Sequence, residues 1–204
     1  MSTPMYPVRL VGGHDLERSR LTVFFRLILL IPHLIVLVVY GIAAEVVTII
    51  AWFAALFTGR VPDGMHDFIA GFIRYAGRVY AYGGILANPY PPFGSGGTYP
   101  VDLEIDPAVA QSRLTVFFRI ILAIPCWFVM SILQYLFELL ALGNWIVAVI
   151  TGRVPNGMQN LGMFCLRFML RTQAYLLLVN PRYPAFGDTP GSLPHDAAAL
   201  PPLP

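Results

Sequence analysis

The chain has 204 residues, of which 57% are hydrophobic and 12% are charged, and its formal net charge is +2. Soluble domains usually contain about 25% charged residues, and a nucleic-acid-binding protein needs a concentrated basic surface. The composition therefore argues against a soluble enzyme, a disordered regulator and a nucleic-acid-binding protein, and it favours a membrane protein with several hydrophobic segments.

The chain is a tandem duplication. Residues 19–26 recur without change at 112–119, and residues 58–65 recur with one substitution at 151–158. A single offset of 93 residues relates both pairs, and self-similarity at a fixed offset is the signature of repeated structural units. We therefore predict a first membrane repeat over 6–93, a second over 99–186 and a disordered, proline-rich tail over 187–204.

Each repeat begins with an alternating segment. Val8 and Leu10 share one face in the first repeat, and Val101 and Leu103 do so in the second. Alternation of this kind is typical of a β-strand. We expect two short strands outside the bilayer, and their shared pattern allows the two copies to pair with each other.

An amphipathic helix follows the strand over residues 18–31 and again at the same place in the second repeat. Arg18, Thr22 and Arg26 lie four residues apart, so they form one polar stripe on an otherwise apolar helix. A helix of this kind suits the membrane interface. Pro32 is expected to start a new helix, because proline is tolerated in the first helical turn.

Residues 33–57 form a long apolar segment. A helix of this length measures about 37 Å, and a bilayer core is about 30 Å thick, so the helix can cross with some tilt. The sequence Val-Pro-Asp-Gly then predicts a turn. We expect Arg60 in this turn, and Arg153 in its second copy, to contact lipid headgroups.

The segments 66–87 and 161–179 either return across the membrane or lie in its interface. They carry two arginines each, namely Arg74, Arg78, Arg167 and Arg171. An arginine at the bilayer centre costs about 2.5–3.5 kcal/mol. In an antiparallel hairpin, Glu45 lies at the depth of Arg78, and Glu138 lies at the depth of Arg171. Ion pairs at matched depth would make the buried arginines tolerable, which favours the return.

Two spans per repeat place both turns on one side and both termini on the other. Seven arginines would share the side of the termini, namely Arg9, Arg18, Arg20, Arg26, Arg113, Arg119 and Arg182. The positive-inside rule then puts the termini in the cytoplasm. We therefore predict an all-α membrane protein, a tandem repeat of two helical hairpins with about four transmembrane helices, interfacial amphipathic helices and short extramembrane strands.

The two Glu–Arg pairs are the candidate site. Ionisable groups inside a membrane are functional candidates, here for a proton or ion relay or for an anion-binding site between the repeats. The same pairs also suit structural locks, one for each hairpin. The histidines do not cluster, and phosphate-binding, dinucleotide-binding and catalytic-serine motifs are absent from the sequence. We therefore expect no catalytic residue, no metal and no cofactor.

The repeated motifs resemble a known family. They are Ser-Arg-Leu-Thr-Val-Phe-Phe-Arg with Ile-Pro-His, then Trp-Phe-Ala-Ala-Leu-Phe-Thr-Gly-Arg, and finally Asn-Pro-Tyr-Pro-Pro-Phe at 88–93. They resemble bacterial membrane proteins grouped as domain of unknown function 4389, which often carry the unit in tandem. The resemblance covers about residues 6–186 and implies a membrane location, but no activity, substrate or cofactor. Cys126 replaces His33 in the second copy, so we do not expect His33 to be a paired ligand.

These expectations combine into an integral protein of the bacterial cytoplasmic membrane. We expect it to be a scaffold or accessory subunit without enzymatic activity. Its expected partners are membrane lipids and a second copy of the chain or another membrane protein, and not nucleic acid. The alternative is a small transporter or channel that uses the intramembrane Glu–Arg pairs.

Overall fold

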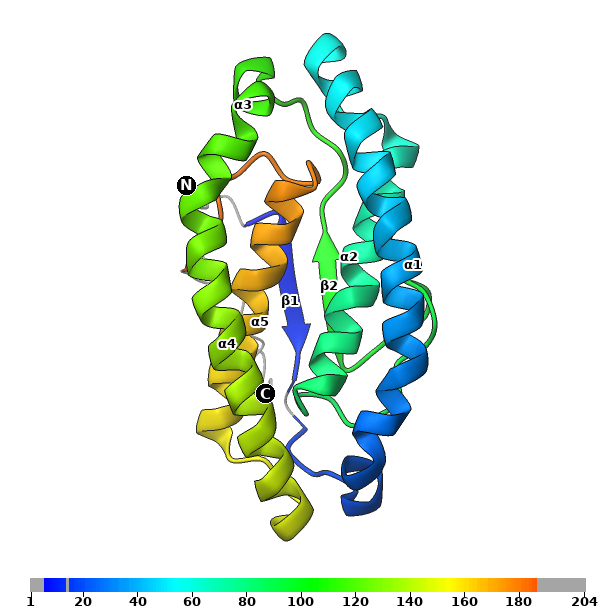
Figure 1. Cartoon of the computed structure of the whole chain (residues 1–204), viewed down its shortest axis with the longest axis vertical. Helices are drawn as coiled ribbons and strands as arrows, with labels where there is room; N and C mark the ends of the chain where they lie inside the picture. Colours follow the sequence, from blue (N-terminus) through cyan, green and yellow to red (C-terminus); the bar gives the residue numbers. More distant parts are fainter. Residues whose placement is uncertain (1–5, 14, 187–204) are drawn as a thin grey trace, which may run out of the picture.

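Each repeat contributes one strand and a pair of long helices to the fold. The computed structural model describes residues 6–13 and 15–186, so the predicted tail at 187–204 lies outside the described residues. The elements are β1 (Val8–Gly12), α1 (Arg20–Thr58), α2 (Asp63–Gly83), β2 (Val101–Ile105), α3 (Arg113–Phe117), α4 (Arg119–Thr151) and α5 (Asn156–Leu176) (Figure 1). The prediction of a mostly helical tandem repeat with two short strands is confirmed.

Helix α1 covers both the predicted interfacial helix and the predicted span. It has 39 residues and contains Pro32, so the prediction of a new helix at this proline is wrong. Proline removes one backbone donor, but the apolar pattern continues on both sides of it, and the helix continues as well. In the second repeat the break falls at Phe118, between α3 and α4, while Pro125 lies inside α4.

Both long helices end at a glycine. Gly59 follows α1 with φ of 79°, and Gly152 follows α4 with φ of 75°. Glycine adopts this left-handed conformation without the steric penalty of a side chain, which stops the helix. Pro62 and Pro155 then precede α2 and α5. The predicted break between the helices is confirmed in both repeats, but Val-Pro-Asp-Gly does not form the predicted turn, because α2 begins within it at Asp63.

The two strands pair with each other as an antiparallel ribbon, as their shared pattern allowed. Leu10 lies opposite Leu103, and these two residues are equivalent under the offset of 93. Val8 lies opposite Ile105, and Gly12 lies opposite Val101. The offset of 93 converts the first of these pairs into the second. The two repeats are therefore related by a pseudo-two-fold axis that passes through the pair of leucines.

The pseudo-two-fold axis makes the two hairpins antiparallel to each other. The indole Nε1 of Trp52 donates to the Val116 carbonyl, and that of Trp145 donates to the Val23 carbonyl, both at 3.0 Å. The end of each long helix thus lies beside the beginning of the other (Figure 1). The layout predicted from the sequence, with both turns on one side, is therefore wrong for this structure.

Helices α2 and α5 form an inner layer. They contact each other. In addition, α2 contacts β2 and α1, and α5 contacts β1 and α4. The ribbon directs Val8, Leu10, Val101 and Leu103 into the interior. Its other face carries polar side chains, among them a pair between Arg9 and Glu104 at 3.3 Å.

The outer helices carry most of the apolar surface. Among the residues that the structure describes, 17 exposed large hydrophobic side chains lie on α1, 15 lie within 113–151, and seven lie elsewhere. Only 11% of the most apolar segment of α1 and 17% of that of α4 are buried, so neither helix is mostly covered by the rest of the described chain. These two helices are long and apolar enough to cross a membrane, whereas α2 and α5 are not among such helices.

Candidate functional site

The arginines of the inner helices hold the ribbon. Arg78 of α2 is 1% exposed and donates from Nε and Nη2 to the Asp102 carboxylate at 3.1 and 2.8 Å. Its remaining donors reach the carbonyls of Gly96 at 2.6 Å and Gly97 at 2.8 Å. The predicted pair of Arg78 with Glu45 is therefore wrong, because the strand beside α2 offers a closer carboxylate.

The neighbouring and the equivalent arginines have related roles. Arg74 donates to the Leu103 carbonyl at 2.9 Å, so it also holds β2. Arg171 of α5 donates to the Val8 carbonyl at 3.2 Å and lies over the Tyr6 ring at 4.3 Å, so it holds β1. Arg167 is half-buried one turn earlier on the same face of α5.

Tyr6 completes the contact between α5 and the first strand. Burial raises the pKa of Tyr6 to about 12, although the positive charge of Arg171 acts in the opposite direction. The ring under the guanidinium therefore carries a neutral hydroxyl near pH 7. Cation–π contacts of this kind stabilise desolvated sites more than exposed ones.

The two glutamates lie apart from these arginines. Glu45 and Glu138 are both exposed. The Glu138 carboxylate accepts a hydrogen bond from Gln134 Nε2 at 3.2 Å, one turn earlier on its own helix. The proposed pairing with Arg171 therefore does not describe the surroundings of Glu138, and the four predicted site residues do not form one cluster.

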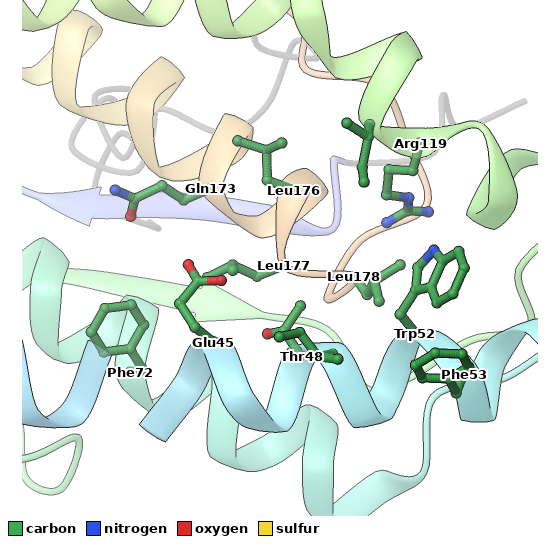
Figure 2. Close-up of a pocket in the computed structure, with 12 residues that line it drawn as sticks. Glu45, Thr48, Trp52, Phe53, Phe72, Arg119, Gln173, Leu176, Leu177 and Leu178 are labelled. Carbon is green, nitrogen blue, oxygen red and sulfur yellow. The ribbon is translucent and has the colours of Figure 1, made fainter. Parts of the chain in front are cut away.

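Each glutamate instead lines a groove between the two long helices. The first groove has a volume of about 630 Å³ and is lined by Glu45, Trp52, Arg119, Gln173 and other, mostly apolar residues. Figure 2 shows the Glu45 carboxylate directed from α1 toward α5, with both strands passing behind the groove. The second groove, of about 180 Å³, contains Glu138 and Tyr80, which are equivalent to Glu45 and Gln173.

Arg26 and Arg119 are buried and close the ends of the inner helices. Arg26 donates to the carbonyls of Tyr82, Ala87 and Asn88 at 2.9, 3.0 and 3.3 Å, and it stacks on the Tyr82 ring at 4.2 Å. A cation here also opposes the partial negative charge of the α2 C-terminus.

The second copy reproduces this arrangement. Arg119 donates to the carbonyls of Tyr175 and Asn180 at 2.8 and 3.3 Å and to Gln111 Oε1 at 2.6 Å. The backbone beyond each inner helix turns through a left-handed residue, Ile85 or Leu178. The sequence predicts both arginines in interfacial helices at the membrane surface, whereas the structure buries them. Their position within a polar stripe of an apolar helix was compatible with burial as well.

Arginines also mark the two ends of the molecule. Arg60 is half exposed and forms an ion pair with Asp63 at 2.6 Å. Its equivalent, Arg153, forms a backbone bridge with Glu17. The side chain of Arg113 lies beside Gly59 at the first turn, and that of Arg20 lies beside Gly152 at the second. Each turn thus brings together two arginines from different repeats.

The described residues hold no group of three His, Cys, Asp or Glu side chains that is placed to bind a metal ion. His33 is buried, and its Nδ1 lies 2.7 Å from the Tyr75 hydroxyl. Its ring also stacks on Phe93 at 4.5 Å. His33 therefore packs among aromatic residues of the first repeat.

Comparison with known proteins gives one match. The family model described as Domain of unknown function (DUF4389) matches the chain twice, over residues 20–95 and 113–187. No curated protein and no solved structure matches the chain. The two matches follow the two repeats and leave out the strands that join them.

Proposed function

Because the chain belongs to this family, whose description names no activity, we propose a function from the geometry: an integral protein of the bacterial cytoplasmic membrane that acts as a non-enzymatic scaffold or accessory subunit. The observation that carries this proposal is the apolar surface of α1 and of residues 113–151. Soluble monomers rarely expose contiguous apolar patches of more than a few hundred Å². Lipid acyl chains are the surroundings that such a surface requires.

The contacts of the polar side chains support a scaffold. Arg26, Arg78 and Arg119 bind backbone carbonyls or a strand carboxylate and hold the elements together. They are therefore occupied with the fold rather than directed at a substrate. We include a second copy of the chain or another membrane protein among the partners, together with lipids.

The membrane location has a direct test. After expression in bacteria, the chain should stay in the membrane pellet through washes with high salt and alkaline carbonate, and detergent should release it. A peripheral protein held by charge would leave the pellet in these washes, because salt screens exposed charges. Recovery of folded chain in the cytosol or in the carbonate wash would contradict the proposal.

A transporter is the second candidate, because Glu45 and Glu138 are carboxylates exposed on apolar helices. For a scaffold, proteoliposomes with the wild-type chain should show no proton or anion flux above that of empty liposomes. The double variant Glu45→Gln, Glu138→Gln should behave identically and remain folded, since exposed substitutions usually change stability by less than about 0.5 kcal/mol. A wild-type flux that the folded double variant loses would establish the transporter instead.

A further inference from the structure

We propose that α1 and α4 lie parallel to the membrane surface within one leaflet, with the β1–β2 ribbon facing water. This inference rests on the proposed membrane location and specifies which part of the bilayer is the partner. In this arrangement the pseudo-two-fold axis runs along the membrane normal, so that both repeats meet the same leaflet in the same way. The two grooves that contain Glu45 and Glu138 then point toward the acyl chains, as do the outer faces of the long helices.

The length of α1 argues for this arrangement. Its 39 residues correspond to about 58 Å. This helix fits a hydrocarbon core of about 30 Å only at a tilt near 60°, beyond the observed range of roughly 0–40°. Apolar side chains are exposed along its whole length, from Leu21 at 72% to Phe57 at 72%. A helix that lies in the leaflet immerses all of them.

The position of the ribbon argues in the same direction. The ribbon lies midway along the long axis of the molecule (Figure 1). Its polar face carries Arg9, which pairs with Glu104 at 3.3 Å and Asp106 at 3.1 Å. If the long helices crossed the bilayer, these charges would lie at its midplane, where ionisable side chains are most unfavourable. In the parallel arrangement the same charges face water.

The arginines at the two ends complete the argument. One end holds Arg60 and Arg113, and the other holds Arg20 and Arg153. The symmetry places both pairs at the same depth when the axis is normal to the membrane. Long arginine side chains reach from apolar surface to the headgroup region, and basic residues there attract anionic lipids. The apolar surface of the protein therefore has arginines at both ends, where they can reach the headgroups of the same leaflet.

The glutamates are compatible with this embedding because they face the grooves. Glu45 is directed toward α5, where Gln173 lies, rather than away from the molecule (Figure 2). Glu138 has Gln134 as a hydrogen-bond partner. Both carboxylates therefore have polar neighbours within the grooves.

The test is a depth profile with nitroxide labels. Single cysteines replace Leu21, Val38 and Phe57 on α1 and Glu104 on the ribbon, in a background with Cys126→Ala and Cys165→Ala that keeps the wild-type helicity and melting temperature. The chain is reconstituted in vesicles that contain phosphatidylglycerol and phosphatidylethanolamine. Collisions with oxygen and with a water-soluble nickel chelate then give the depth of each label.

Labels along α1 should lie within about 5 Å of one depth, as for an interfacial helix, and the label at position 104 should be accessible to nickel. A spanning helix would place position 38 about 15 Å deeper than 21 and 57. That profile would overturn the inference while leaving the membrane location intact. Nickel accessibility at all four positions would overturn both proposals. Shielding from both reagents would identify a protein partner on α1 and overturn the inference.

A second measurement uses the two turns. Cysteines at Thr58 and Thr151, both exposed, should react with a membrane-impermeant maleimide from the same side of right-side-out or inverted vesicles. In the spanning arrangement the antiparallel hairpins would place these two positions on opposite sides. The parallel embedding would be overturned if one position reacted only in right-side-out vesicles and the other only in inverted vesicles.

Discussion

Replacing Arg78 with methionine should lower the free energy of unfolding by about 3–5 kcal/mol, the usual cost of removing one partner of a buried ion pair. The substitution leaves the carbonyls of Gly96 and Gly97 without the guanidinium and leaves the Asp102 carboxylate with only the Leu103 N–H as a donor. Asp102 is still partly covered by the inner helix, so water cannot replace the guanidinium fully. Chemical denaturation in detergent micelles, followed by circular dichroism, measures the effect.

The matched control for this variant is Glu45→Gln. Glu45 is exposed and lies away from Arg78, so the control should change stability by less than about 0.5 kcal/mol. A double-mutant cycle with Asp102→Leu should show a coupling of about 0.5–3 kcal/mol between positions 78 and 102. Equal losses for Arg78→Met and Glu45→Gln, or a coupling between these two positions, would support the pair expected from matched depth.

The repeat and its alternating strands could be predicted from the sequence because they depend on local patterns. An offset of 93 residues requires two equivalent units, and matching strand patterns lead to a symmetric pairing of Leu10 with Leu103. The break between the two helices of each repeat follows from the proline and glycine that interrupt the apolar pattern. In these cases the short-range chemistry agrees with the tertiary structure.

The ion pairs could not be predicted because depth along a hairpin leaves out the direction in which a side chain points. Ala44 is buried, and Glu45 follows it by one residue, which is about 100° around the helix. Arg78 points to the ribbon instead. The partner, Asp102, lies in a strand that the hairpin argument left outside the membrane. It was detectable only as the single carboxylate between the buried residues Val101 and Leu103.

The predicted layout of the arginines is wrong for a related reason. It counted Arg18, Arg26 and Arg119 as surface charges, but all three are buried and bind backbone carbonyls. Net charge along a sequence does not distinguish an arginine that caps a helix from one that binds a headgroup. The relative direction of the hairpins depends on the ribbon, which contacts both repeats.

Replacing Arg119 with methionine should destabilise the chain by at least about 2 kcal/mol, because it removes a donor from three acceptors, of which the Tyr175 carbonyl keeps the Leu178 N–H at 3.3 Å, and each buried unpaired group costs about 1–3 kcal/mol. The acceptors are the carbonyls of Tyr175 and Asn180 and the side chain of Gln111. Arg26→Met should have a similar effect, since its three acceptors are backbone carbonyls at the equivalent end of α2. Thermal and chemical unfolding in micelles would measure both losses.

Arg119→Lys separates the geometry of this cap from its charge. Lysine keeps the positive charge but lacks the planar fork that reaches several acceptors and stacks on a ring, so it should recover less than half of the lost stability. Arg113→Met, six residues earlier and exposed, is the matched control and should stay within about 0.5 kcal/mol of the wild type. Full recovery by lysine would show that charge near the helix end suffices. A loss at position 113 equal to that at position 119 would contradict the structural role of the buried arginine.

The distinction matters for the membrane arrangement, because arginines that cap the inner helices cannot also anchor the chain to headgroups. That role is left to Arg20, Arg60, Arg113 and Arg153.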